Sequence, residues 1–327
     1  MTREAQLIER VRRKFPSTTD GLRAGIGDDA AVLRRAGRAE WVVTTDAFLE
    51  NVHFLRRVHP PKAVGYKALA RATSDLAAMG ARPRYFLLTL ALPLSCTKKW
   101  LDEFLDGMAL AARRFGLILV GGDTTKYPSV VVSLTVLGEI DPGRAILRSC
   151  ARPGDLICVS GRLGEAELGL RLVQKIWHKR KQWKKLTKKH FYPEPRLALG
   201  QWLVAHQSAT SMIDTSDGLS TDLGHLCEAS GVGARVWADK IPLVSVPAQL
   251  KRLGLDPMRL ALHGGEDYEL LFTVPKRLAQ RLPRKVGGVP LTIIGEITRG
   301  KGITLLGPRG EGTPLRPGGW DPFRKRG

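Results

Sequence analysis

The sequence predicts a mixed α/β protein with two domains. Apolar runs rich in β-branched residues alternate with longer segments of helical periodicity in both halves of the chain. At roughly 100–200 residues per domain, the length of 327 residues predicts two domains. The string "RSCARPGDLICVSG" has a Pro-Gly-Asp turn before a new hydrophobic run, which predicts a boundary near Ala151. We therefore expect an N-terminal α/β domain over 1–150 and a C-terminal α/β domain over 151–327.

Each element is predicted from its local pattern. Short runs such as "EWVVT" and "SVVVSLTVLG" are typical of strands, which we expect at Glu40–Thr44, Tyr85–Leu92, Ser129–Gly138, Asp155–Val159, Phe272–Val274 and Thr292–Gly295. Longer periodic segments predict helices at Glu4–Lys14, Pro61–Ala78, Lys98–Phe115, Glu165–Trp177, Leu197–Val204 and Thr221–Ser230. The segment from Gly307, rich in Gly, Pro and Arg, is expected to be irregular and to close over something or lie loose in solvent.

The chain is strongly basic. Its 52 Lys and Arg residues against 31 Asp and Glu residues give a formal net charge of +21. Such a charge favours polyanions, which include nucleic acid, an anionic surface and phosphorylated small molecules, and does not choose among them. The apolar run Tyr85–Leu94 is shorter than the roughly 18 residues of a membrane span, and the N-terminus lacks a signal-peptide pattern. We expect a cytoplasmic protein without membrane contact.

Two further features favour ordinary interpretations. The four cysteines, Cys96, Cys150, Cys158 and Cys227, include no CxxC pair, so free thiols are expected rather than zinc ligands or disulfides.

The segment "KIWHKRKQWKKLTKK" at 175–189 is overwhelmingly basic and contains two tryptophans. A solvated helix with half-buried aromatics is the favoured interpretation, and a patch for nucleic acid or a membrane surface is the alternative.

Acidic residues follow small or hydroxyl residues at several points of the chain. "GIGDDAAVL" places Asp28 and Asp29 side by side after a glycine turn, and "ATSDLAAMGA" places Asp75 in an apolar helical segment. The other members, at the ends of apolar runs, are Thr44, Thr45 and Asp46, then Gly122 and Asp123, then Asp214, Ser216, Asp217 and Asp222. Each string alone could be a turn or a helix cap. Together they indicate an oxygen-rich magnesium and phosphate site at the strand ends of an α/β sheet.

Familiar nucleotide-binding strings are absent from the sequence. It contains no GxxxxGK[ST] string and no kinase HRD or DFG string. The stretch Gly161–Leu170, "GRLGEAELGL", is a glycine turn entering a helix, which could approach a phosphate with backbone N–H groups or simply turn the chain.

Taken in order, these motifs resemble the thiamine-monophosphate kinase family. The resemblance runs from Gly25 to Gly295 and rests on "GIGDDAAVL", "TTDAFLENVHF", "GYKALARATSDLAAMGARP", "GGDTT", "LRSCARPGDLICVSGRLGEAELGL", "IDTSDGLSTDL" and "GGEDYELLFTVP". The ending "GGWDPF" is also similar to the family's closing aromatic motif. The resemblance implies the two-domain fold of the aminoimidazole-ribonucleotide synthetase superfamily and a homodimer joined through N-terminal sheets. It also implies ATP-dependent phosphorylation of thiamine monophosphate to thiamine diphosphate with several magnesium ions.

The resemblance assigns roles residue by residue. The implied metal ligands are Asp29, Thr44, Thr45, Asp46, Asp75, Asp123, Asp214 and Asp217. Nucleotide contacts are implied for Gly122, Asp123, Arg148 and Ser216. Contacts to thiamine phosphate are implied for His53, Glu266 and Trp320, and the catalytic aspartates are expected to be Asp46, Asp123 and Asp217. Of the adjacent pair, Asp29 is the expected ligand, and Asp28 shapes the turn or supports its neighbour.

The sequence departs from the family pattern at a few positions and leaves alternatives open. Ala72 and Thr73 stand where Asn-Leu is common, Asn51 and Cys150 stand where glycine is usual, and none of these changes removes a ligand. Another enzyme of the superfamily, such as a selenophosphate synthetase, the purine-pathway synthetase or a hydrogenase-maturation protein, is the second hypothesis. Against it, we find no N-terminal Cys-Lys arrangement and no cysteine in the ending "FRKRG". A nucleic-acid-binding module using 175–189 is the third.

Overall fold

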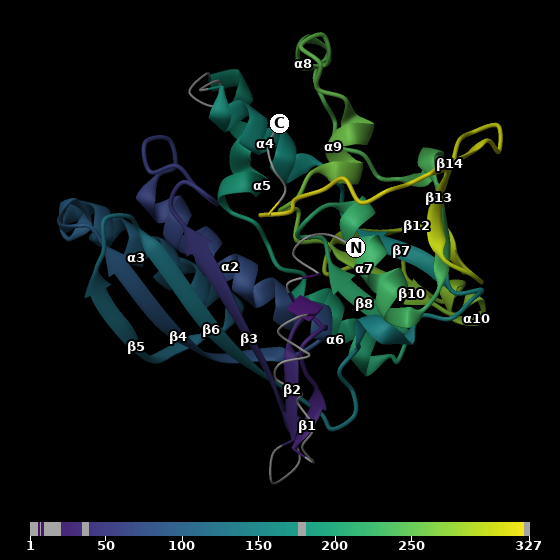
Figure 1. Ribbon diagram of the computed structural model, residues 1–327, viewed down its shortest axis with the longest axis horizontal. Coiled ribbons are helices and arrows are strands. Elements are labelled where there is room, and N and C mark those ends of the chain that lie inside the picture. Colours follow the sequence, from purple (N-terminus) through teal and green to yellow (C-terminus); the bar gives the residue numbers. More distant parts are fainter. Residues whose placement is uncertain (1–5, 7, 10–20, 35–38, 176–180, 324–327) are drawn as a thin grey trace.

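Two sheets and the helices between them make up the fold. The computed structural model describes residues 6, 8–9, 21–34, 39–175 and 181–323. Within that part of the chain no helix is long and apolar enough to cross a membrane. Figure 1 shows the two sheets on opposite sides of the molecule, with α2 and α6 between them.

The first sheet lies in the N-terminal half. Its strands run in the spatial order β1-β2-β3-β6-β4-β5. Their bounds are β1 (Leu22–Ala24), β2 (Ala31–Arg34), β3 (Glu40–Leu49), β4 (Arg82–Leu92), β5 (Ile118–Lys126) and β6 (Val131–Ile140). Only the pair β4 and β5 is parallel, which requires the crossover helix α3 (Lys99–Phe115) between them.

One face of the first sheet is covered by α2 (Pro61–Met79) and α3. Strand alternation buries every second residue of β6, so Val132, Leu134 and Val136 enter the core while the residues between them stay half-exposed. The two helices cross closely at two glycines. A Cβ on Gly65 would lie 1.9 Å from the carbonyl oxygen of Phe104, and one on Gly107 would lie 1.9 Å from that of Lys62. These positions therefore require glycine.

The second sheet lies in the C-terminal half. Its main path runs β14-β13-β9-β12-β7-β10-β8, and β11 pairs with β12 beside this path. The strands are β7 (Leu156–Ser160), β8 (Ser211–Asp214), β9 (Gly233–Trp237), β10 (Leu270–Val274), β11 (Lys285–Val286), β12 (Val289–Thr298), β13 (Gly302–Leu306) and β14 (Gly312–Pro314). The described helices of this half are α4 (Glu165–Gln174), α5 (Lys188–Phe191), α6 (Leu197–Ala205), α7 (Leu219–Ser230), α8 (Ala248–Lys251), α9 (Pro257–His263) and α10 (Lys276–Ala279). Short 3₁₀ segments are η1 (Leu94–Cys96), η2 (Arg148–Cys150), η4 (Lys181–Thr187) and η5 (Ala238–Lys240).

Helix α2 joins the two halves. Besides β3 and β6 of its own sheet, it contacts α6 and β8 of the other half. Nearly all of its residues are buried, including polar side chains such as Lys67, Thr73 and Ser74. A helix buried on all sides can present functional groups to an interior site from its middle turns, and α2 does so.

The six predicted strands are present, but several are longer than predicted. Thr44, Thr45 and Asp46 lie inside β3, which continues to Leu49, so the expectation that they end a strand is wrong. The segment around Asp123 is likewise the interior of β5. Strands β3 and β6 pair over their full lengths. This pairing keeps β3 extended through polar residues that the local sequence pattern assigns to a turn.

Among the helices, the predicted segment at Glu4–Lys14 falls almost wholly outside the described residues. Helix α4 follows the prediction from Glu165 to Gln174, while 176–180 lie outside the described residues. In the basic segment, Trp183 is buried against Leu168 and Leu172, and Lys181, Lys184, Lys185 and Lys188 are exposed. Trp183 therefore serves packing, as the favoured interpretation expects, but it is buried rather than half-buried, and 181–187 form the 3₁₀ segment η4 rather than an α-helix. Trp177 lies outside the described residues.

Candidate functional site

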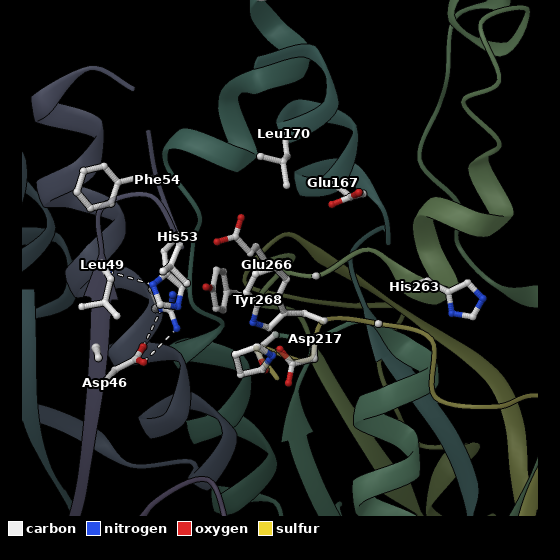
Figure 2. Close-up of a pocket in the computed structure, with 18 of the residues that line it drawn as sticks. Asp46, Leu49, His53, Phe54, Glu167, Leu170, Asp217, His263, Glu266 and Tyr268 are labelled. Carbon is white, nitrogen blue, oxygen red and sulfur yellow. Dashed lines mark hydrogen bonds and ion pairs between the residues drawn. The ribbon is translucent and has the colours of Figure 1, made fainter. Parts of the chain in front are cut away.

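A large polar pocket lies where the two halves meet. Its volume is about 940 Å³. The first sheet contributes β3 and the loop after it, and α2 contributes its middle turns. The C-terminal half contributes α4, the turn after β8, the segment between α9 and β10, and the final segment 318–323. Figure 2 shows side chains from both halves converging on this space.

Three aspartates at one end of the pocket form a possible cation site. Oxygen atoms of Asp29, Asp75 and Asp214 lie within 4.8 Å of one another. They come from the glycine turn before β2, from α2 and from the end of β8. Hydroxyls support two of them, since Thr44 donates to Asp75 at 2.5 Å and Ser74 donates to Asp214 at 2.5 Å. Carboxylate and hydroxyl oxygens are the donors that a hard divalent cation takes.

The electrostatics of this cluster favour a bound cation. Burial, together with the charge of Asp214, raises the pKa of Asp75 well above its ordinary value. Burial and the charge of Asp29 raise the pKa of Asp214 to about 7. Within the described part of the chain, the buried Oδ2 of Asp29 also has no hydrogen-bond partner. Crowded carboxylates with an unsatisfied buried oxygen are stabilised when a positive ion enters.

Alternation along β3 separates the predicted ligands of this strand. Thr44 is buried and faces Asp75, whereas Thr45 is exposed on the other face, 3.3 Å from the hydroxyl of Thr135. Asp46 shares the face of Thr44 and lines the pocket. Its carboxylate is held by Arg71 through two hydrogen bonds of 2.8 and 3.0 Å, drawn as dashed lines in Figure 2.

Arg148 and Asp28 hold the glycine turn at the edge of the aspartate cluster. The Arg148 guanidinium donates to Asp29 at 2.5 Å, and its backbone N–H donates to Asp28 at 3.2 Å. The carboxylate of Asp28 also accepts the backbone N–H of Asp29 at 2.9 Å. Burial and the charge of Asp29 raise the pKa of Asp28 to about 6. The two neighbours thus differ, because Asp29 belongs to the cluster and Asp28 braces the turn.

The turn after β8 holds other predicted site residues together. The carbonyl of Ser216 accepts the N–H of Glu266 at 2.8 Å, and that of Asp217 accepts the N–H of Trp320 at 3.0 Å. The N–H of Asp217 in turn points at the carboxylate of Asp222, 3.3 Å away. These backbone bonds gather segments that are about 50 and 100 residues apart in sequence.

Glu266 is the centre of a buried charged network. Its carboxylate is 2.6 Å from the Lys67 ammonium and 3.3 Å from Nδ1 of His190. His190 lies 3.0 Å from His59 through their Nε2 atoms. Burial alone would raise the pKa of Glu266, but Lys67 and His190 outweigh it and hold the pKa well below its ordinary value. Figure 2 shows the Glu266 carboxylate between His53 and Glu167, so a permanent anion faces the pocket.

His53 and Trp320 both line the pocket. Nδ1 of His53 accepts the backbone N–H of Leu49 at 3.0 Å, and its ring stacks on Phe48. Burial and the nearby charge of Arg71 lower the pKa of His53 to about 4, so the ring is neutral at pH 7. Trp320 lines the pocket from the final segment, 318–323. The expectation that the chain is irregular from Gly307 is wrong at Gly312–Pro314, which pair with β13 as the strand β14.

Gly122 and Asp123 lie apart from these residues within one chain. Both are on β5, where every residue is exposed, and β5 is separated from β3 by β6 and β4. At about 4.8 Å per strand, the separation from Asp46 is roughly 14 Å. The register pairs Asp123 with Thr89, Thr89 with Ser133 and Ser133 with Ala47. Asp123 therefore shares a sheet face with Thr45, opposite to α2 and α3. Apart from Thr45, which lies on the same sheet face as Asp123, the other predicted site residues line the pocket or the adjoining cluster and turn.

The sequence patterns missed several residues of the site. Lys67 and Arg71 were not singled out, although they precede Asp75 at intervals of four in the same apolar helical segment. A charged side chain in an apolar helical segment is as unusual at these two positions as at Asp75. Tyr268, His190 and Glu167 also belong to the site or its support, but only the tertiary contacts reveal this.

Family models and solved structures resemble this arrangement across both halves. The model "AIR synthase related protein, N-terminal domain" matches 27–140, and "AIR synthase related protein, C-terminal domain" matches 152–307. The solved structure described as "AaThiL complexed with AMPPCP and TMP" is 32% identical, with a TM-score of 0.83 and coverage of 97% of this chain and 96% of that one. The thiamine-monophosphate kinase structure from Stenotrophomonas maltophilia is 38% identical, with a TM-score of 0.75 and coverage of 94% and 96%. The fold and its site thus define an AIR-synthase-related α/β protein.

Curated relatives narrow the class further. The thiamine-monophosphate kinases of Salmonella typhimurium and Escherichia coli K12 are each 39% identical over 90% of this chain and 90% of their own. That of Bacillus subtilis is 35% identical over 84% of this chain and 85% of its own. The chain belongs to the thiamine-monophosphate kinase family. Hydrogenase maturation protein HypE structures, at 21–23% identity, share the fold alone.

Proposed function

We propose that this chain transfers the γ-phosphoryl group of ATP to the phosphate of thiamine monophosphate, giving thiamine diphosphate and ADP. The observation that carries the proposal is 39% identity to kinases of this name over 90% of the chain. It is supported by the likeness to a structure that holds AMPPCP and TMP. The pocket adds chemical support, because one end carries crowded carboxylates and the other a buried anion beside aromatic rings.

The acceptor explains why the site is rich in carboxylates and needs no general base. A phosphate monoester has a second pKa of about 6, so its terminal oxygen is already a nucleophile at pH 7. The difficulty is the repulsion between that dianion and the phosphates of ATP. Bound magnesium ions supply the charge neutralisation that phosphoryl transfer requires. The orphaned oxygen of Asp29 and the raised pKa values of Asp75 and Asp214 fit such ions.

The proposed ligand set extends around this cluster. Asp29, Asp75 and Asp214 would hold the first ion, and Asp46 and Asp217 line the adjoining pocket. We propose that Thr44, Thr45 and Asp123 complete the set for further ions, and that Asp46, Asp123 and Asp217 are the catalytic aspartates. Arg148, Gly122 and Ser216 are the proposed nucleotide contacts, with the Arg148 guanidinium neutralising phosphate charge.

The other end of the pocket fits the cationic thiamine rings. Glu266 is held as an anion by Lys67 and His190, and an aromatic face such as that of Trp320 attracts a thiazolium. Neutral His53 can offer its Nε2 hydrogen to the substrate, since Nδ1 already accepts a backbone N–H.

We further propose that the protein is a homodimer joined through its first sheet. Strand β5 ends that sheet, and Ile118, Leu119 and Val120 are 60%, 51% and 55% exposed. An apolar edge strand is a ready pairing surface. A second chain covering this face would also bring protein to the side where Thr45 and Asp123 lie. The N-terminal domain of 1–150 would then carry the dimer interface, and 151–327 would complete the substrate site.

A direct assay tests the proposed function. Purified protein is incubated with ATP, magnesium chloride and either thiamine monophosphate or thiamine, and ADP and thiamine diphosphate are measured. We expect ADP and thiamine diphosphate in equal amounts with the monophosphate. No product with the monophosphate would contradict the proposal, and a preference for free thiamine would indicate a different kinase.

A further inference from the structure

One face of α2 presents a row of charged side chains to the pocket region. Lys67, Arg71 and Asp75 are spaced four residues apart, so they lie along one side of the helix. Over these eight residues the helix rises about 12 Å. At one end of the row Lys67 pairs with Glu266, and at the other end Asp75 belongs to the aspartate cluster. Arg71 is therefore placed between the two ends of the pocket.

Arg71 presents its guanidinium in a geometry suited to an oxyanion. Nε and Nη2 contact the two carboxylate oxygens of Asp46 at 2.8 and 3.0 Å, which is a two-pronged interaction. The guanidinium also lies 5.3 Å from the ring centre of Phe48, within the range of a cation–π contact. Its side chain is 17% exposed and lines the pocket. The same fork binds a carboxylate or a phosphate equally well.

In the structure Arg71 pairs with Asp46, but the proposed function requires the Asp46 carboxylate for binding magnesium. Asp46 is one of the proposed magnesium ligands, and a carboxylate that coordinates an ion has less negative charge to offer an arginine. A poorly solvated guanidinium then requires another anion. The acceptor's phosphate is the anion that must lie between the thiamine rings near Glu266 and the cations near Asp75.

We propose that Arg71 binds the phosphate of thiamine monophosphate. When a cation is bound to Asp46, the guanidinium pairs with this phosphate instead of with the Asp46 carboxylate. Arg71 then selects the phosphorylated substrate over free thiamine and holds its nucleophilic oxygen beside the cations. This inference rests on the proposed function. In the competing interpretation Arg71 only fixes Asp46, and the phosphate is bound by cations alone.

Binding measured without turnover separates the two interpretations. Thiamine monophosphate and thiamine are each titrated calorimetrically into protein saturated with magnesium and AMPPCP. The variants are Arg71→Met, Arg71→Lys and the control Arg84→Met. Arg84 also forms an ion pair, with Glu139 at 2.8 Å, but it is not among the residues that line the pocket. Thermal denaturation of each variant verifies that it is folded.

We expect Arg71→Met to weaken binding of the monophosphate by about 10- to 100-fold, the value of a charged hydrogen-bonded pair. Binding of thiamine should change by less than about threefold, since no phosphate contact is lost. Arg71→Lys should recover part of the monophosphate affinity, and Arg84→Met should match wild type.

Three outcomes would count against this inference. Equal weakening of both ligands by Arg71→Met would mean that Arg71 only fixes Asp46, and unchanged binding would mean that it has no role in affinity. Either result, with wild-type protein binding the monophosphate, overturns the inference and leaves the proposed function standing. Failure of wild-type protein to bind thiamine monophosphate at all would overturn both.

Discussion

At the scale of single residues, some carboxylates of the site lower the stability of the fold, because they are buried beside like charges. Asp214 is buried beside other carboxylates, and burial together with the charge of Asp29 raises its pKa to about 7. The Ser74 hydroxyl, which donates to Asp214 at 2.5 Å, and the charge of Arg148 offset this rise only in part, while oxygens of Asp29 and Asp75 lie close to those of Asp214. Such a residue is kept for what it binds and not for what it contributes to folding.

Replacing Asp214 tests how its charge affects stability and magnesium binding. In magnesium-free buffer we expect Asp214→Asn to be more stable than wild type by about 1–3 kcal/mol, because a buried like charge is removed. Magnesium should raise the melting temperature of wild type but not that of the variant, and turnover should be lost. Urea unfolding measures the difference in free energy, thermal denaturation with and without magnesium measures the melting temperatures, and the kinase assay measures turnover. A variant that is less stable and still stabilised by magnesium would show that the cluster is not the cation site.

Glu269 has the opposite character. Its buried carboxylate is 2.6 Å from the Lys189 ammonium, 2.6 Å from Nε of Arg196 and 2.5 Å from the hydroxyl of Ser160. Burial alone would raise its pKa, but Lys189 and Arg196 outweigh burial and lower it. Because the pKa is lower in the folded than in the unfolded state, the stabilisation is present above the unfolded value and is lost as the pH falls.

Glu269→Gln should therefore destabilise the protein most at neutral pH. We expect a loss of about 3–5 kcal/mol at pH 7, the usual effect of breaking a buried ion pair. The difference should shrink below the ordinary glutamate pKa of about 4.3, where the wild-type carboxylate also begins to lose its advantage. Urea unfolding at pH 7, 5 and 3.5 measures the trend. A difference that is independent of pH would show that the charge of Glu269 is not what stabilises the fold.

At the scale of elements, α2 is the part on which the site depends. It carries Lys67, Arg71, Ser74 and Asp75, and its position is set by close packing on α3. The carbonyls of Phe104 and Lys62 leave no room for a Cβ at Gly65 or Gly107. A displacement of α2 would move all four polar residues together.

Gly65→Ala and Gly107→Ala should each destabilise the protein by about 1–3 kcal/mol or more, because backbone atoms cannot yield as a flexible side chain can. Turnover should fall with them, since the helix carries the site. Gly21→Ala is the matched control, because a Cβ there would have no atom within 4 Å and the backbone of Gly21 is not in the left-handed region. Thermal denaturation and the kinase assay provide the readouts. Stability equal to that of the control would mean that the helices can separate freely.

At the scale of the whole molecule, the two halves form one site, yet two predicted ligands, Thr45 and Asp123, lie outside it. Asp123 is on the exposed face of the first sheet, at its outer strand. The apolar residues Ile118, Leu119 and Val120 precede it on the same strand. The proposed homodimer accounts for both observations, because it covers the edge and places protein on the face that carries Asp123. The cytoplasmic location stays a prediction, and a polyanion contact through 175–189 stays the less favoured alternative for that segment.

Leu119→Asp tests the dimer. A charge on a paired edge strand should convert dimer to monomer at micromolar concentration, which light scattering after gel filtration measures. Leu253→Asp is the control, because Leu253 is comparably exposed, at 54%, but lies away from the first sheet. Loss of activity together with the dimer would agree with a site that needs the second chain. A wild-type protein that is monomeric would contradict the proposal before any variant is made.

The amino-acid sequence by itself determined the fold class, the family and most of the site. Short-range patterns are sufficient there, since strands and helices follow local periodicity and motifs such as "GIGDDAAVL" and "IDTSDGLSTDL" keep their acidic residues at fixed spacing. The tertiary structure decided what depends on pairing and burial. It placed Thr44 and Thr45 on opposite faces of β3 and put Asp123 on a distant strand. It also gave Glu266 its partners Lys67 and His190 and aligned Arg71 with Asp46. The physical reason is that a ladder register or a buried ion pair joins residues far apart in sequence, and no local pattern records such a contact.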